Sequence, residues 1–79
     1  MNLSQYHCKQ IGERLRALRG DTPAEETAKA VGISIKALSA YENGERIPRD
    51  EIKIKLAYHY GKSVESIFYA QLASAAGVM

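Results

Sequence analysis

A three-residue link near the middle of the chain does most to constrain the fold. Residues 32–34 (Gly-Ile-Ser) join two short segments with helical signals, Ala24–Val31 and Ile35–Glu42. A glycine ends the first segment, and a serine that can cap a helix precedes the second. Two helices joined by so short a link cannot lie side by side in antiparallel fashion. The sequence therefore predicts two helices that cross at a steep angle.

Small and apolar residues stand at the positions that such a crossing requires. Helix axes approach closely only at a small residue, and Ala28 lies one turn before Gly32. Apolar residues are also needed on both inner faces, and the chain supplies Val31, Ile33, Leu38 and Tyr41. This spacing of a small residue, a glycine and apolar residues is typical of a DNA-binding helix-turn-helix.

Helical signals continue on the N-terminal side of this pair. Apolar residues recur at helical spacing in the first segment, at Cys8, Ile11, Leu15 and Leu18. Gly20 is placed to end that helix in a left-handed conformation. The next helix is expected to start with a capping box, in which Thr22 caps, Pro23 takes the first helical position and Glu25 closes the box.

Two more helices are predicted on the C-terminal side, which gives a single all-α domain of five helices. Asp50 lies in an acidic first turn that suits the helix dipole, and Gly61 ends this fourth helix. Residues 52–56 also alternate as a strand would, but the helical spacing of Ile52, Leu56 and Tyr60 favours a helix. Ser63 caps a fifth helix, which contains Val64, Ile67 and Phe68.

Length and composition narrow the range of functions. Seventy-nine residues suffice for one compact domain, and no apolar run approaches the roughly 20 residues of a membrane helix. The N-terminus lacks a signal-peptide pattern, and the single cysteine, Cys8, cannot form an internal disulfide. These features predict a cytoplasmic protein.

Neither a catalytic nor a metal site is indicated. The chain has no glycine-rich phosphate loop and no paired carboxylates that would form a cleft. His7 and Cys8 are neighbours, so on a helix they face different ways, and with His59 they form no metal-binding spacing. We expect no metal, no cofactor and no enzymatic activity.

The chain resembles the lambda-repressor-like helix-turn-helix family, of the Cro/repressor and xenobiotic-response-element type, over about residues 11–69. The matching segments are IGERLRALRG, EETAKAVGISIKALSAYENGERIPRDEIKIKLA and YGKSVESIF, and the most specific piece is GIS followed by YENGERIP. The resemblance implies that residues 1–69 contain a helix-turn-helix DNA-binding domain. The uncharged, apolar composition of residues 70–79 predicts a C-terminal extension. The resemblance also implies that the Ile35–Glu42 helix enters the major groove.

The resemblance assigns roles to individual residues. Residues expected to face base edges are Ile35, Lys36, Ser39 and Ala40. Residues expected to meet phosphates are Arg19, Asn43, Arg46 and Arg49. Residues expected to hold the motif together are Ala28, Gly32, Leu38 and Glu42. In the family pair that Arg19 and Glu42 match, the glutamate holds an arginine that is aimed at the DNA backbone.

Each of these residues also has a plainer interpretation. Lys36 and Ser39 can be ordinary solvated helix residues, and the arginines at 46 and 49 can be exposed loop charges. The pair of Arg19 and Glu42 can be a purely structural tie. The chain also departs from the family pattern, with Ala24 in place of the frequent glutamine, Thr27 in place of a larger apolar residue, and Glu45 in place of a basic residue.

Two hypotheses for function remain. The favoured one is a sequence-specific regulator of prokaryotic or phage type, a repressor that binds double-stranded DNA as a homodimer on a pseudo-palindromic operator. The alternative is a protein-interaction module that keeps this fold and has little DNA affinity. Because no separate effector domain is evident, any signal is expected to act through this domain or through a regulatory protein partner.

The predicted dimer surface is the C-terminal stretch. Residues 66–79 carry no charged side chain, and the apolar residues expected at the surface run from Ile67 through Phe68, Tyr69 and Leu72 to Val78. The alternative is that Ile67 and Phe68 complete the core while residues 70–79 fray.

Overall fold

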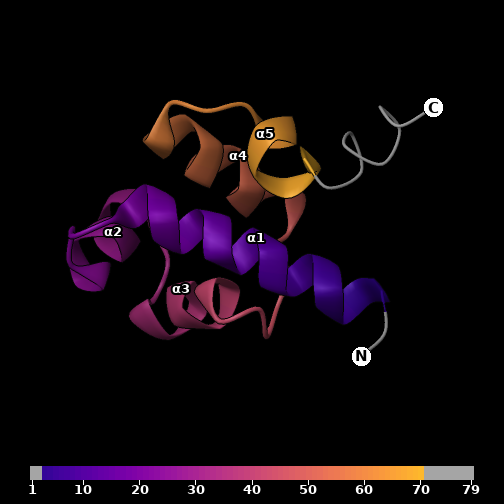
Figure 1. The fold of residues 1–79 in the computed structure, drawn as a ribbon. Coiled ribbons are helices and arrows are strands. Elements are labelled where there is room, and N and C mark those ends of the chain that lie inside the picture. Colours follow the sequence, from indigo (N-terminus) through magenta and orange to yellow (C-terminus); the bar gives the residue numbers. More distant parts are fainter. Residues whose placement is uncertain (1–2, 71–79) are drawn as a thin grey trace.

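The computed structural model describes residues 3–70, which form five helices and no strand (Figure 1). The helices are α1 (Leu3–Arg19), α2 (Ala24–Val31), α3 (Ile35–Glu42), α4 (Asp50–Tyr60) and α5 (Val64–Phe68). The predicted all-α class is confirmed, and α3 and α4 have the bounds that their capping signals predicted. None of the helices in this part of the chain is long and apolar enough to cross a membrane.

The long helix α1 organises the packing. It runs across the molecule with α3 on one side and α5 on the other, while α2 contacts both α3 and α4 (Figure 1). Its inward-facing Leu15 is fully buried, and Leu38 of α3 and Leu56 of α4 are buried to the same extent. Burying a leucine side chain contributes roughly 1.5–3 kcal/mol, so these three residues stabilise the core that α1, α3 and α4 share.

Helices α1 and α3 meet at a glycine. A Cβ on Gly12 would lie 2.8 Å from the carbonyl oxygen of Tyr41 and closer still to that of Glu42. Any larger residue would therefore push α1 away from the end of α3. Ala28, the small residue that the sequence marked for the crossing of α2 and α3, is also buried, with 1% of its surface exposed.

The turn between α2 and α3 has the geometry that its sequence predicted. Gly32 adopts a left-handed φ of 83°, and the N–H groups of Gly32 and Ile33 both donate to the carbonyl of Ala28 at 2.9 Å. The Ser34 hydroxyl oxygen accepts a hydrogen bond from the Ala37 N–H at 3.0 Å. Both helix ends are thereby satisfied within a three-residue link.

The capping box predicted at the start of α2 is wrong. Pro23, with a ψ of 139°, stands at the cap position outside the helix, and no side chain caps α2. The N–H groups of Glu26 and Thr27 instead bond to the carbonyl of Pro23, so the helix begins one residue later than expected. Thr22 contributes its backbone carbonyl, which accepts a hydrogen bond from Arg19 Nη1 at 2.7 Å.

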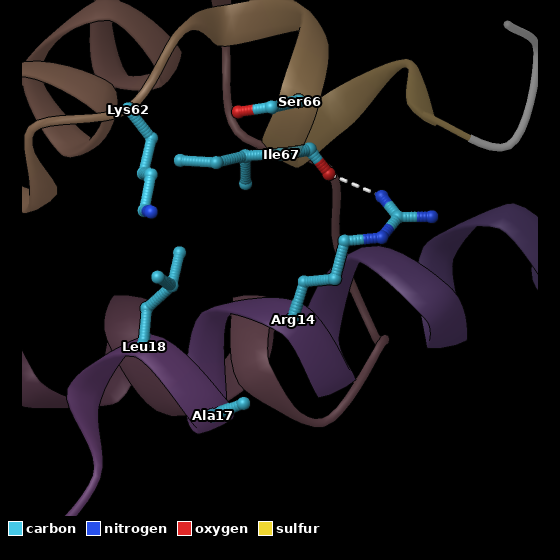
Figure 2. Close-up of a pocket in the computed structure, with 6 residues that line it drawn as sticks. All are labelled: Arg14, Ala17, Leu18, Lys62, Ser66 and Ile67. Carbon is cyan, nitrogen blue, oxygen red and sulfur yellow. Dashed lines mark hydrogen bonds between the residues drawn. The ribbon is translucent and has the colours of Figure 1, made fainter.

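The contact between α1 and α5 corrects the predicted dimer surface. Ile67 and Phe68 each expose only 1% of their surface, so both complete the core. Arg14 Nη1 donates to the backbone carbonyl of Ile67 across this contact (Figure 2). Tyr69 is 37% exposed, whereas Leu72 and Val78 lie outside the described residues.

A shallow hollow of about 310 Å³ lies beside that hydrogen bond, between α1 and α5 (Figure 2). It is lined by Arg14, Ala17, Leu18, Lys62, Ser66 and Ile67. Because α3 packs on the other side of α1, this hollow is separate from the surface that α3 presents (Figure 1).

Candidate nucleic-acid interface

The outward face of α3 carries the residues that were predicted from the sequence to contact base edges. Leu38, Tyr41 and Glu42 turn into the domain, which leaves the other side of this two-turn helix in solvent. Lys36 and Ser39 are exposed, Ile35 is 49% exposed, and Ala40 is half-buried. An open hollow along this face is lined by Ser34, Ile35, Lys36, Ala37, Ser39, Ala40, Glu45 and Arg46.

A bidentate ion pair anchors α3 to α1. Arg19 Nε donates to Glu42 Oε2 at 2.7 Å, and Arg19 Nη2 donates to Glu42 Oε1 at 2.9 Å. The Glu42 side chain is only 3% exposed and that of Arg19 is 18% exposed. The hydrogen bond to Glu42 raises the pKa of Arg19, against the opposing effect of its own burial. The two side chains therefore form an ion pair that joins α1 to the end of α3.

Arg16 belongs to the same cluster, although the sequence did not single it out. Its Nη2 donates to Asn43 Oδ1 at 2.8 Å, and its Nε lies 3.9 Å from Glu42 Oε1. Its side chain is 60% exposed, so the guanidinium is available to solvent. Arg16 precedes Arg19 by three residues and shares its helix face, which is the signal that could have identified it.

Asn43 connects Arg16 to the recognition face. Its Nδ2 donates to the Ser39 hydroxyl oxygen at 3.2 Å, while its Oδ1 accepts from Arg16. A chain of side-chain hydrogen bonds thus runs from α1, across the end of α3, to a residue expected to read bases. Asn43 was predicted to contact phosphate, and it is exposed at the C-cap of α3.

The loop after α3 brings charges of both signs to this surface. The Arg46 guanidinium lies 6.0 Å from the centre of the Tyr41 ring, near the outer limit for a cation–π contact. Glu45 lines the same hollow as Lys36 and Arg46, so its carboxylate lies within the predicted base-reading surface. Arg49 is exposed at the cap position of α4.

The other two departures from the family pattern lie inside the domain. Ala24 is half-buried and packs against the core, and Thr27 is 1% exposed. The hydroxyl groups of Thr27 and Tyr60 are both buried, and they lie close enough to interact. Burial raises the pKa of Tyr60 and the Glu42 carboxylate raises it further, while the nearby Thr27 hydroxyl and Arg19 act in the opposite direction.

No arrangement for metal binding is found in the part of the chain that the structure describes. Among residues 3–70, no three His, Cys, Asp or Glu side chains gather closely enough to hold an ion. Cys8 is a free, half-buried thiol. The chemistry offered by the outward face of α3 is hydrogen bonding, apolar contact and positive charge.

Two short helices in contact across a three-residue turn, with the second helix exposed and arginines beside it, have the arrangement of a helix-turn-helix DNA-binding domain. Comparison with known families agrees, because a model of the Cro/C1-type helix-turn-helix family matches residues 13–67, which is more than half of the chain. The chain belongs to this family of DNA-binding transcription regulators, which are not enzymes, and the resemblance inferred from the sequence is confirmed. The curated proteins gave no match, and neither did the solved structures.

Proposed function

We propose that this protein is a cytoplasmic repressor of prokaryotic or phage type that binds a pseudo-palindromic DNA operator as a homodimer. One observation carries the proposal: the outward face of α3 is solvent-exposed, while its inner face is tied to α1 through the buried carboxylate of Glu42. A short helix held this rigidly can enter a major groove with its side chains already in place.

Each residue on that face has a role that its chemistry permits. Lys36 donates to guanine O6 and N7 or to a phosphate, and Ser39 bonds to a base edge. Ile35 and Ala40 contact a thymine methyl group or exclude a wrong base. The residues that we assign to phosphates are Arg16, Arg19, Asn43, Arg46 and Arg49. Arg16 joins the set predicted from the sequence because it is exposed beside Asn43.

The homodimer follows from the small footprint of one recognition helix. The eight residues of α3 span only a few base pairs, too few for useful specificity in a genome. A two-fold axis would place two copies of α3 about 34 Å apart, one turn of DNA. Because Ile67 and Phe68 are buried, we assign the dimer contact to Tyr69 and the predicted extension of residues 70–79.

The alternative function is a protein-interaction module with little DNA affinity. It is favoured by Glu45, whose carboxylate lines the hollow along α3 and would repel a nearby phosphate. A regulatory protein partner is compatible with either function. The two proposals differ in whether the outward face of α3 binds duplex DNA.

Selection on random duplexes, followed by binding measured against salt concentration, separates these functions. The repressor is expected to enrich a palindromic sequence, and log K should fall steeply with log salt, by about 0.9 per phosphate contact. Lys36→Ala should cost about 1–3 kcal/mol at one base pair of each half-site if Lys36 reads guanine. A uniform loss across sequences with a shallower salt slope would make Lys36 a phosphate contact instead.

Lys55→Ala is the matched control, because Lys55 is an exposed α4 lysine that pairs with Glu51 at 3.5 Å. It should leave sequence preference unchanged. If no duplex is enriched and binding shows no salt dependence, the repressor proposal fails and the interaction module is favoured.

The proposed dimer contact has its own test. Deleting residues 71–79 should leave a folded monomer with weaker operator binding. A truncated protein that still sediments as a dimer would refute this placement of the contact.

A further inference from the structure

The Asn43 side chain has a fixed orientation between a donor and a hydroxyl. A guanidinium carries only N–H donors, so the Asn43 atom that faces Arg16 must be the amide oxygen. The amide nitrogen then faces Ser39, and it has only hydrogens to offer to Ser39 Oγ. The direction of both hydrogen bonds is set by Arg16.

This orientation determines what the Ser39 hydroxyl can do. A serine hydroxyl has one hydrogen to donate and two lone pairs that accept. In the described structure, Asn43 Nδ2 occupies one lone pair, and the Ser39 hydroxyl hydrogen is donated to no protein atom. Since Asn43 presents no acceptor toward Ser39, that hydrogen is available to a group outside the protein.

We propose that Arg16 and Asn43 act as positioning residues that make Ser39 a hydrogen-bond donor toward DNA, so that Ser39 selects a base with an acceptor in the major groove. Guanine, with O6 and N7, and thymine, with O4, present only acceptors there, cytosine presents only the N4 amino donor, and adenine presents both the N7 acceptor and the N6 amino donor. The inference rests on the proposed DNA-binding function and adds a specificity determinant, Arg16, that itself need not touch a base.

Removing Arg16 releases the orientation. Without it, the Asn43 amide can rotate by half a turn so that Oδ1 accepts the Ser39 hydrogen, which leaves only lone pairs to face the groove. Asn43→Asp imposes that reversed state, because a carboxylate of nearly the same shape accepts from both Arg16 and Ser39. The base preferred at this position should then shift toward those with amino donors, cytosine and adenine.

The test measures binding of the full chain to its selected operator and to duplexes with each of the four bases at one position. Ser39→Ala locates that position, as the base pair at which discrimination is lost. There, Arg16→Ala should reduce the wild-type preference for an acceptor base by about fivefold, the effect of one hydrogen bond, and Asn43→Asp should move the preference to an amino-bearing base.

Arg46→Ala is the matched control, because it removes a nearby positive charge that takes no part in the hydrogen bonds of Asn43 with Arg16 and Ser39. It should weaken binding to all four duplexes equally. The positioning role of Arg16 and Asn43 is wrong if Ser39→Ala abolishes discrimination between bases while Arg16→Ala and Asn43→Asp retain the wild-type preference. Circular dichroism would show that both of these variants are folded. The positioning role is also wrong if Ser39→Ala changes no position. A wild-type protein that selects no sequence would refute the proposed function itself, before any variant is compared.

Discussion

The ion pair between Arg19 and Glu42 allows the sharpest prediction, because it joins α1 to α3 through a buried carboxylate. Arg19→Ala removes both hydrogen bonds to Glu42, at 2.7 and 2.9 Å, and a third to the carbonyl of Thr22. The Glu42 side chain, at 3% exposure, would then lack its cationic partner and have little access to water. We therefore expect a stability loss well above that of a surface ion pair.

The structure sets the size of this loss. Removing one partner of a buried pair costs about 3–5 kcal/mol, whereas exposed pairs are worth about 0–1 kcal/mol. Arg19 is 18% exposed, and Arg16 Nε at 3.9 Å can partly replace it, so we expect about 2–3 kcal/mol. For a domain of this size that corresponds to a decrease in Tm of roughly 10–20 °C.

Thermal and denaturant unfolding of four proteins would measure the pair. They are the wild type, Arg19→Ala, Glu42→Gln and the double variant, and the double variant should be little worse than Arg19→Ala alone because the two losses are shared. Arg16→Ala is the control and should cost less than 1 kcal/mol, since that side chain is 60% exposed. If Arg19→Ala leaves Tm within 3 °C of the wild type while DNA affinity falls, the arginine serves phosphate and the tie is not structural.

Three further predictions address the packing, the buried phenol and the acidic loop residue. Gly12→Ala should lower the free energy of unfolding by about 1–3 kcal/mol, because the new methyl group meets the α3 carbonyls. The control Lys29→Ala, at an exposed position of α2, should leave that free energy nearly unchanged when both are measured by urea denaturation. The pKa of Tyr60 is raised in the folded protein, so the stability that the protonated phenol contributes is complete below about pH 10 and is lost as pH rises through the folded pKa. The difference in unfolding free energy between wild type and Tyr60→Phe should therefore stay constant between about pH 7 and 9 and change above about pH 10. Glu45→Gln should tighten operator binding at low salt by removing a repelled charge from the α3 hollow, and unchanged affinity in a salt titration would place Glu45 away from phosphate.

Local signals predicted the elements well because each signal acts within one helical turn. Ser34 caps α3, Asp50 begins α4, and Gly61 ends it with a left-handed φ of 66°, all as the sequence indicated. The error at α2 is also local. Thr22 and Glu25 have the spacing of a capping box, but Pro23 takes the cap position itself, so the threonine hydroxyl is one residue too far from the helix.

Features that depend on distant contacts could not be inferred from spacing alone. The C-terminal stretch lacks charge, which suits a dimer surface and a buried core equally well. Only the packing of α5 on α1 and α4 shows that Ile67 and Phe68 belong to the core. The hydrogen bond from Arg16 joins residues 27 positions apart. Gly12 offered a clue, because a glycine inside a helix costs roughly 0.5–1 kcal/mol and is retained where a neighbour comes close.

The crossing of α1 and α3 brings stability and the proposed recognition surface to the same place. Gly12 permits α1 to approach the backbone of Tyr41 and Glu42, and this approach places two arginines of α1 beside the end of α3. One of them, Arg19, satisfies the buried carboxylate, while Arg16 orients the amide that bonds to Ser39. A change that moves α1 by even 1 Å would therefore be felt at Ser39 as well as in the core, because hydrogen bonds weaken steeply when their geometry is lost.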